Sequence, residues 1–233
     1  MEKCSIIQLM HRKKYKLLIS RLLIQNSYVL DIGFGFGYLK PLVENLGANY
    51  LGIDPRTDGA VEYAKKKYGN KGFIHGYFPE ANTLTKEELN NGLIISLTTM
   101  DEVVDQLFFL QEINKLCSEE TKVYITVRNS DWYFFRKKEL KTVDGDKIFD
   151  YGVEDYKKKF KENGFDILSI EKSSRPILTS FTFNGFKTLI IVLLDIILPT
   201  QRSYMLGFLL RKTDVIEKTD LLKSRKNQNY TSK

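Results

Sequence analysis

The chain has 233 residues, of which 42% are hydrophobic and 28% are charged, as in one ordinary soluble globular domain rather than two small ones. Its net charge of +7 is compatible with nucleic acid, an anionic membrane surface or an anionic substrate as a partner, and equally with solubility alone. Cys4 and Cys117 lack CxxC spacing and the N-terminus lacks a signal-peptide pattern, so we expect a cytoplasmic protein without a disulfide framework.

Strands and helices are expected to alternate along the chain after a basic amphipathic helix. The expected strands lie at 28–32, 49–55, 72–78, 92–97, 122–128, 165–175 and 203–212. The expected helices lie at 6–24, 38–47, 58–69, 85–90, 100–118 and 152–164. In the short helix at 85–90, Thr85 and Glu88 have the spacing of a capping box. This alternation indicates an α/β, doubly wound fold with one sheet.

The composition also predicts how the chain is divided. We expect a single domain over 1–213, with a basic helix within 1–27 and an apolar insertion at 176–202 before the last strand. The polar segment 214–233 is expected to be a flexible tail.

The first strand is followed by a glycine-rich turn in the stretch "VLDIGFGFGYL", residues 29–39. Gly33, Gly35 and Gly37 have no Cβ, so a ligand can approach the backbone closely. Neither the dinucleotide pattern GxGxxG nor the phosphate-loop pattern with GK[ST] is present. Asp31 would repel a phosphate but suits a cationic ligand, while the alternative is a tight turn that binds nothing.

This stretch resembles motif I of the class I S-adenosylmethionine-dependent methyltransferases, which reads roughly "vLDiGxGxGxl". Asp54, 23 residues after Asp31, stands where that family has the acid that takes both ribose hydroxyls. A role as a turn former or helix N-cap ahead of Pro55 is the alternative. The resemblance covers residues 28–128. It implies a Rossmann-like, mostly parallel seven-stranded sheet with an antiparallel last strand and helices on both faces.

The resemblance also implies S-adenosyl-L-methionine as the cofactor and S-adenosyl-L-homocysteine as the product. In the stretch "HGYFPEA", Tyr77 stands in place of the acid that the family has beside adenine, and Phe78 is expected to contact adenine through its backbone or ring. The cofactor-binding residues implied in this way are Asp31, Gly33, Phe34, Gly35, Gly37, Asp54, Pro55, Tyr77, Phe78, Leu97 and Thr98.

Candidate catalytic residues follow the fourth and fifth strands, where the substrate should enter. Glu102, in the stretch "MDEV", stands in place of a family histidine and is a candidate base; the alternative is an acid favoured by a helix dipole. Asp101 is its neighbour, and Arg128 is a candidate clamp for an anionic substrate or an ordinary ion-paired arginine. Further candidates near these strand ends are Asn129, Asp131 and Tyr133. His11 and His75 have no third ligand at fixed spacing, so no metal is expected.

Two apolar segments remain without an assigned role. The aromatic run 132–135 is expected to line a substrate pocket or to belong to the core. The segment 181–202 is too short to span a bilayer, and three interpretations stay open for it: a buried helix over the substrate pocket or core, a homodimer contact, or peripheral contact with a membrane or lipid substrate.

We therefore expect methyl transfer to a small-molecule or lipid- or glycan-linked acceptor, at oxygen, by a cytoplasmic protein that can contact the inner membrane face. The alternatives are an N- or protein methyltransferase and a non-catalytic cofactor-binding partner subunit. Nucleic acid is not expected as a substrate, because the chain contains neither the Asn-Pro-Pro-Tyr nor the Pro-Cys signature of base methyltransferases.

Overall fold

A computed structural model describes residues 15–131, 151–172 and 205–213, and all structural statements concern these residues. Residues 15–22 are helical. The strands are β1 (Tyr28–Ile32), β2 (Asn49–Asp54), β3 (Phe73–His75), β4 (Leu93–Leu97), β5 (Lys122–Arg128), β6 (Phe165–Lys172) and β7 (Met205–Lys212). The helices are α2 (Lys40–Glu44), α3 (Ala60–Tyr68), the 3-10 turn η1 (Met100–Glu102), α4 (Gln106–Leu116) and α5 (Val153–Glu162).

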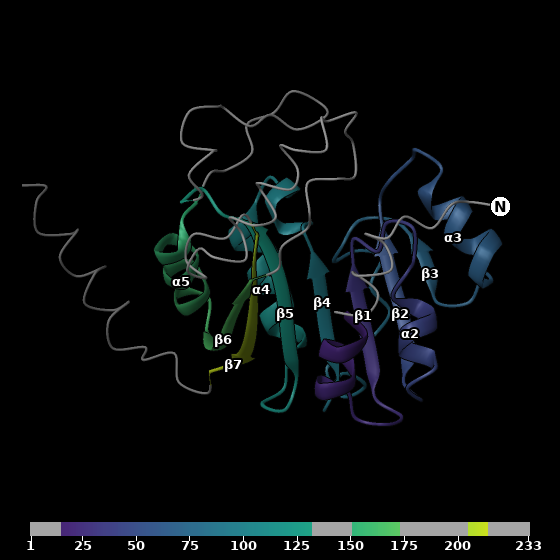
Figure 1. Cartoon of the computed structure of the whole chain (residues 1–233), viewed down its shortest axis with the longest axis horizontal. Coiled ribbons are helices and arrows are strands. Elements are labelled where there is room, and N and C mark those ends of the chain that lie inside the picture. The colour runs from purple at the N-terminus through teal and green to yellow at the C-terminus, as the bar shows by residue number, and fades with distance from the viewer. Residues whose placement is uncertain (1–14, 132–150, 173–204, 214–233) are drawn as a thin grey trace, which may run out of the picture.

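The strands form one seven-stranded sheet in the order β3-β2-β1-β4-β5-β7-β6. The pairs from β3 to β5 are parallel, and β7 runs antiparallel to both β5 and β6. The expected Rossmann-like sheet with an antiparallel last strand is thus confirmed (Figure 1). The order of the strands reverses between β1 and β4, and in such sheets ligands bind outside the carboxyl ends of the strands at this point.

Each face of the sheet carries its own hydrophobic cluster because successive strand side chains point to opposite sides. Leu30 and Ile94 belong to the cluster that also contains residues of α4 and α5, such as Phe109 and Phe160. Val29 and its neighbours pack instead with the helix at 15–22, α2 and α3. Helices therefore cover both faces, as the sequence predicts.

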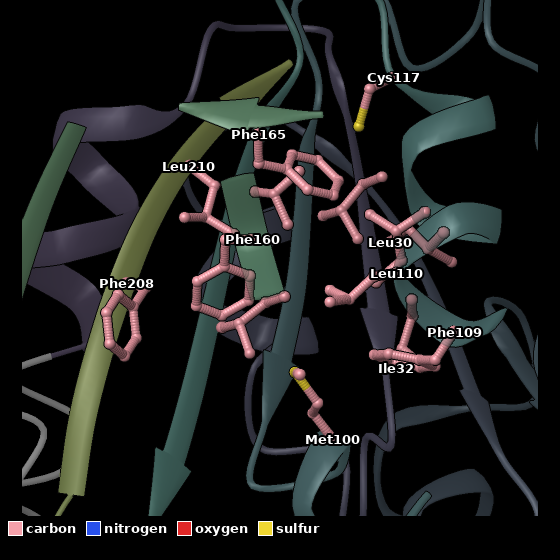
Figure 2. Packing of buried hydrophobic residues seen from close by; sticks show 14 of the residues in the cluster. Leu30, Ile32, Met100, Phe109, Leu110, Cys117, Phe160, Phe165, Phe208 and Leu210 are labelled. Carbon is pink, nitrogen blue, oxygen red and sulfur yellow. The ribbon is translucent and has the colours of Figure 1, made fainter. Parts of the chain in front are cut away.

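The spacing of buried residues explains how α4 and α5 attach to the sheet. In α4 the buried side chains are Gln106, Phe109, Leu110 and Ile113, which form one stripe along the helix. In α5 they include Tyr156 and Phe160, whose rings lie 6.0 and 5.0 Å from that of Phe208 on β7. Figure 2 shows Phe160, Phe165, Phe208 and Leu210 at this end of the cluster and Met100, Ile32 and Phe109 at the other.

Three expected helices differ from the structure. Residues 85–90 form turns rather than a helix: Thr85 and Glu88 do make the reciprocal bonds of a capping box, but Asn91 at φ 58° turns the chain into β4. The expected helix at 100–118 is divided into η1 and α4, because Val103 is extended and Asp105 starts a new helix by accepting a bond from Phe108 N. The helix expected at 38–47 is regular only over α2.

Several expectations fall on residues outside the described part: the start of the N-terminal helix, the ends of the strands expected at 165–175 and 203–212, the insertion at 176–202 and the tail at 214–233. Within the described ranges, the helices are all too short or too polar to cross a bilayer.

We predict that Phe208→Ala lowers the free energy of unfolding by about 3–5 kcal/mol, because it leaves a cavity between α5 and the sheet. Leu168→Ala on β6, where the side chain is 46% exposed, is the matched control and should cost less than about 1 kcal/mol. Urea denaturation followed by circular dichroism measures both values. Equal losses in the two variants would contradict this account of the core.

Candidate functional site

The residues expected to form the site lie at one edge of the sheet, where β1, β2, β4 and β5 end (Figure 1). Gly33 follows β1, Asp54 ends β2, Thr98 follows β4 and Arg128 ends β5. Since these four strands are parallel neighbours in the order β2-β1-β4-β5, their carboxyl ends share this edge. The fold thus brings segments from residues 31 to 128 together.

Two of the three glycines in the turn make room for the protein's own side chains. A Cβ on Gly33 would lie 1.9 Å from Oγ1 of Thr99, which donates a hydrogen bond to Ile32 O at 3.0 Å. A Cβ on Gly37 would lie 2.7 Å from the ring of Phe73. Both glycines also have positive φ, so each has a structural reason to be glycine.

Gly35 is different because the space beside it is open. A Cβ at this position, where φ is +55°, would meet only a guanidinium nitrogen of Arg56 at 3.6 Å. The N–H of Gly35 donates to Oδ2 of Asp54 at 2.6 Å, and Arg56 N donates to Oδ1 of the same carboxylate at 2.9 Å. Asp54, which is 1% exposed, therefore ties the glycine turn to the end of β2.

Asp31 is buried beside this turn and accepts a hydrogen bond from a residue of the neighbouring strand β2. The hydroxyl of Tyr50 donates to Asp31 Oδ2 at 2.7 Å. Burial raises the pKa of Asp31 to about 7; the bond from Tyr50 opposes this rise and the Asp54 carboxylate adds to it. Two buried carboxylates on adjacent strands thus favour a cationic group at this place.

The remaining candidate cofactor residues lie on both sides of these acids. Thr98 has φ +64°, an uncommon conformation for a β-branched residue, and its N–H donates to Thr126 O at 3.1 Å. Tyr77 is 72% exposed and lines a pocket of about 510 Å³ with Phe78, whose ring lies 5.7 Å from that of Phe109.

Phe34, Pro55 and Leu97 can contact a ligand mainly through their backbone groups. The ring of Phe34 is buried 4.8 Å from that of Phe73, and the side chain of Leu97 packs against the same hydrophobic cluster. The carbonyl oxygen of Pro55 lies 3.3 Å from Nε2 of His75.

The three candidate catalytic residues are brought together. Asp101, with a fully buried side chain, accepts hydrogen bonds from Arg128 N at 2.9 Å and from the Tyr156 hydroxyl at 3.1 Å. The Arg128 side chain, 24% exposed, has Nη2 3.3 Å from Oε1 of Glu102. Asp101 therefore holds Arg128 in place from below, and only Glu102, 60% exposed, and part of Arg128 face outward.

Burial raises the pKa of Asp101 to about 7, although the bond from Arg128 N and the guanidinium charge oppose the rise.

Two further candidates have structural partners: Asn129 Oδ1 accepts from Asp131 N, and Asp131 Oδ2 accepts from Val153 N at the start of α5. Tyr133 and the aromatic run 132–135 lie outside the described residues.

Tyr50, Thr99 and Tyr156 contact the candidate site but are not identified from the sequence. Only Tyr50 left a usable signal: Gly52, two residues later inside a strand, marks a close approach of another group. Thr99 and Tyr156 reach their partners only through the tertiary fold.

The groups gathered at this edge of the sheet fit an aminoacyl nucleoside cation rather than a phosphate ligand. Asp31 and Asp54 supply negative charge and hydrogen-bond acceptors, Gly35 exposes its backbone, and the pocket at Tyr77 and Phe78 offers an aromatic wall. Within the described residues, no cluster of three or more His, Cys, Asp or Glu side chains is arranged to hold a metal ion.

Known proteins resemble this chain in sequence and in fold. Residues 8–170 match a family model described as a methyltransferase domain. The Ubiquinone biosynthesis O-methyltransferase of Pelagibacter ubique (strain HTCC1062) is 27% identical over 117 residues, which are 50% of this chain and 48% of that protein. The chain thus spans about half the length of the curated relative it matches.

Two solved structures share the fold at low sequence identity. An S-adenosylmethionine-dependent methyltransferase from Mesorhizobium loti aligns with a TM-score of 0.59 and 15% identity, over 84% of this chain and 96% of its own. A second, from Aquifex aeolicus, aligns with a TM-score of 0.55 and 16% identity, over 91% of this chain and all of its own.

We predict that Asp101→Asn changes how stability depends on pH. The folded-state pKa of Asp101 lies above its unfolded value, so its contribution to stability is present below about pH 4 and is lost as the pH rises to about 7. Asparagine keeps both hydrogen bonds because its amide can donate to the Tyr156 oxygen. Relative to wild type, the variant should gain about 1 kcal/mol or more between pH 5 and pH 8.

Urea denaturation at pH 5, 6, 7 and 8 measures this difference. Asp166→Asn, at an exposed position of β6, is the control and should run parallel to wild type. A parallel curve for Asp101→Asn as well would show that Asp101 ionises normally.

Proposed function

Since this chain belongs to the methyltransferase domain family, we propose that it transfers a methyl group from S-adenosylmethionine to a hydroxyl of a small-molecule or lipid- or glycan-linked acceptor. The family is that of the class I S-adenosylmethionine-dependent methyltransferases, and S-adenosylmethionine is its cofactor. One observation carries the proposal: Asp31 near the end of β1 and Asp54 at the end of the adjacent β2 are both buried carboxylates, and the open backbone at Gly35 is bonded to Asp54.

The proposal gives each of these groups a separate task. Asp54 binds the ribose hydroxyls, because its two oxygens keep free lone pairs while accepting from Gly35 N and Arg56 N. Asp31 attracts the cationic aminoacyl end. Gly35 lets the ligand approach the backbone, and the pocket at Tyr77 and Phe78 receives the adenine.

When bound, S-adenosylmethionine supplies a methyl group already activated on a sulfonium. The protein then has to align the acceptor and remove a proton where the acceptor is a hydroxyl. Glu102 is the proposed base because it alone of the two adjacent acids faces outward. Arg128 holds the Glu102 carboxylate at 3.3 Å and is itself held by buried Asp101, which makes Asp101 a positioning residue.

Oxygen as the acceptor atom is supported by the relative from Pelagibacter ubique, which is named an O-methyltransferase. An amine acceptor is the second candidate. The observation in its favour is that Arg128 already engages the Glu102 carboxylate at 3.3 Å, and an amine acceptor needs less help from a base than a hydroxyl does.

The partners and location of the protein are also proposals. We infer a small-molecule substrate, with peripheral contact to a membrane or a second copy of the chain through 181–202, which lies outside the described residues. A non-catalytic cofactor-binding subunit would keep Asp31 and Asp54 but would turn over no acceptor.

We predict that S-adenosylmethionine and S-adenosylhomocysteine bind with dissociation constants in the micromolar range, about −8 kcal/mol. Asp54→Ala should weaken binding at least about tenfold, because it removes the ribose acceptors and frees the turn at Gly35. Isothermal titration calorimetry measures both ligands, with Asp166→Ala on distant β6 as the control. No heat with wild-type protein would refute the assignment of the cofactor.

We predict methyl transfer to hydroxyl acceptors and a fall in kcat of about 10²-fold in Glu102→Gln, with the affinity for S-adenosylhomocysteine unchanged. Methyl-labelled S-adenosylmethionine is incubated with panels of phenols, amines and polyprenyl-linked glycans, and mass spectrometry locates the label. Glu162→Gln on α5, where the side chain is 57% exposed and paired with Lys158, is the matched control. Label found only on nitrogen, or full activity of Glu102→Gln, would contradict the proposed acceptor or base.

A further inference from the structure

The side chains of Tyr50 and Asp31 meet on the same face of the sheet, deep under the glycine turn. Tyr50 is 7% exposed and Asp31 is 1% exposed. The Tyr50 hydroxyl donates to Asp31 Oδ2 at 2.7 Å, while Oδ1 accepts no hydrogen bond from the described residues. The ring of Tyr50 is fixed edge-on against Phe73, with centroids 5.6 Å apart. One carboxylate oxygen is therefore tied down and the other is left for a ligand.

Gly52 makes this contact possible. It pairs with Asp31 across β1 and β2, and it lies two residues from Tyr50 on the same face of β2. A Cβ at this position would lie 2.7 Å from the Tyr50 hydroxyl and 2.8 Å from the ring of Phe34. Without a side chain at position 52, the Tyr50 ring leans along the strand as far as Asp31.

We propose that Tyr50 is a positioning residue that keeps the carboxylate of Asp31 ionised and oriented, so that it can bind the cationic aminoacyl end of the cofactor. This inference rests on the proposed function for the identity of the ligand. The contact between Tyr50 and Asp31 and its effect on the acid do not depend on any ligand.

The Tyr50 hydroxyl acts on the ionisation of Asp31 through electrostatics. Burial and the Asp54 carboxylate both favour the neutral form of Asp31, and the Tyr50 hydrogen bond is the group that opposes them. Burial and the charge of Asp31 raise the pKa of Tyr50, so its hydroxyl stays a donor. On α2, the buried ammonium of Lys40 is paired with Glu44 at 2.6 Å. An acid that titrates near neutral pH is thus biased toward its charged form by one hydroxyl.

The test compares Tyr50→Phe with wild type in two measurements. In the first, carbon-13 NMR of the aspartate carboxyl groups follows the titration of Asp31 without ligand, with Asp31→Asn identifying the signal. Tyr50→Phe should raise the midpoint of this titration by about one pH unit, since the hydrogen bond to the charged form is lost. Removing a hydroxyl that only fills space would leave the midpoint unchanged.

In the second measurement, calorimetry follows S-adenosylhomocysteine binding from pH 6 to pH 8.5. At pH 7 the variant should bind about fivefold more weakly, because a smaller fraction of Asp31 is ionised, and the difference should shrink as the pH rises. Tyr68→Phe is the matched control: its buried hydroxyl makes no hydrogen bond in the described part of the chain. It should follow wild type at every pH.

Gly52→Ala is a second variant, whose Cβ displaces the Tyr50 hydroxyl while the tyrosine is kept. It should raise the Asp31 midpoint as Tyr50→Phe does. An unshifted midpoint in Tyr50→Phe, or a binding loss of equal size at every pH, would overturn the inference while leaving the proposed function intact. No binding of S-adenosylhomocysteine to wild type would overturn the proposed function and the ligand assigned here, whatever the NMR titration shows.

Discussion

The hydrogen bonds that Asp54 accepts from Gly35 N and Arg56 N are the constraint on which the site depends. They connect the glycine turn after β1 to the end of β2, so the open backbone at Gly35 is held against the buried carboxylate of Asp54. The neighbouring glycines serve this arrangement indirectly, because Gly33 makes room for Thr99 and Gly37 for Phe73. The turn is therefore a packed structure with one open position, rather than a flexible loop over a ligand.

The sequence predicts the fold and the cofactor of the family well, for a physical reason. Parallel strands buried on both faces are nearly continuous apolar runs, and glycines with positive φ cannot easily be replaced, so both leave a clear pattern. The local pattern is a poorer guide where tertiary contacts decide. The extended backbone at Val103 divides the helix expected at 100–118, and the capping box at Thr85 closes only a turn.

The acceptor side could not be predicted in the same way because its residues act through partners far away in the sequence. Arg128 and Glu102 face outward as a pair only because Asp101 and Tyr156, 55 residues apart, meet beneath them. The Tyr50 side chain on β2 likewise reaches Asp31 on the neighbouring strand β1. The role of such a side chain depends on its neighbours in space, and the order of the strands, rather than a local motif, decides which neighbours it has.

The central claim is that Asp31, Gly35 and Asp54 together form the binding site for an aminoacyl nucleoside cation. A crystal structure of the chain with S-adenosylhomocysteine tests it most directly. The account predicts ribose hydroxyls on the Asp54 carboxylate, the amino group on the side of Asp31 and the adenine beside Phe78. Density for the ligand elsewhere, or an Asp54 carboxylate that contacts only Gly35 and Arg56 while the ligand is bound, would contradict it.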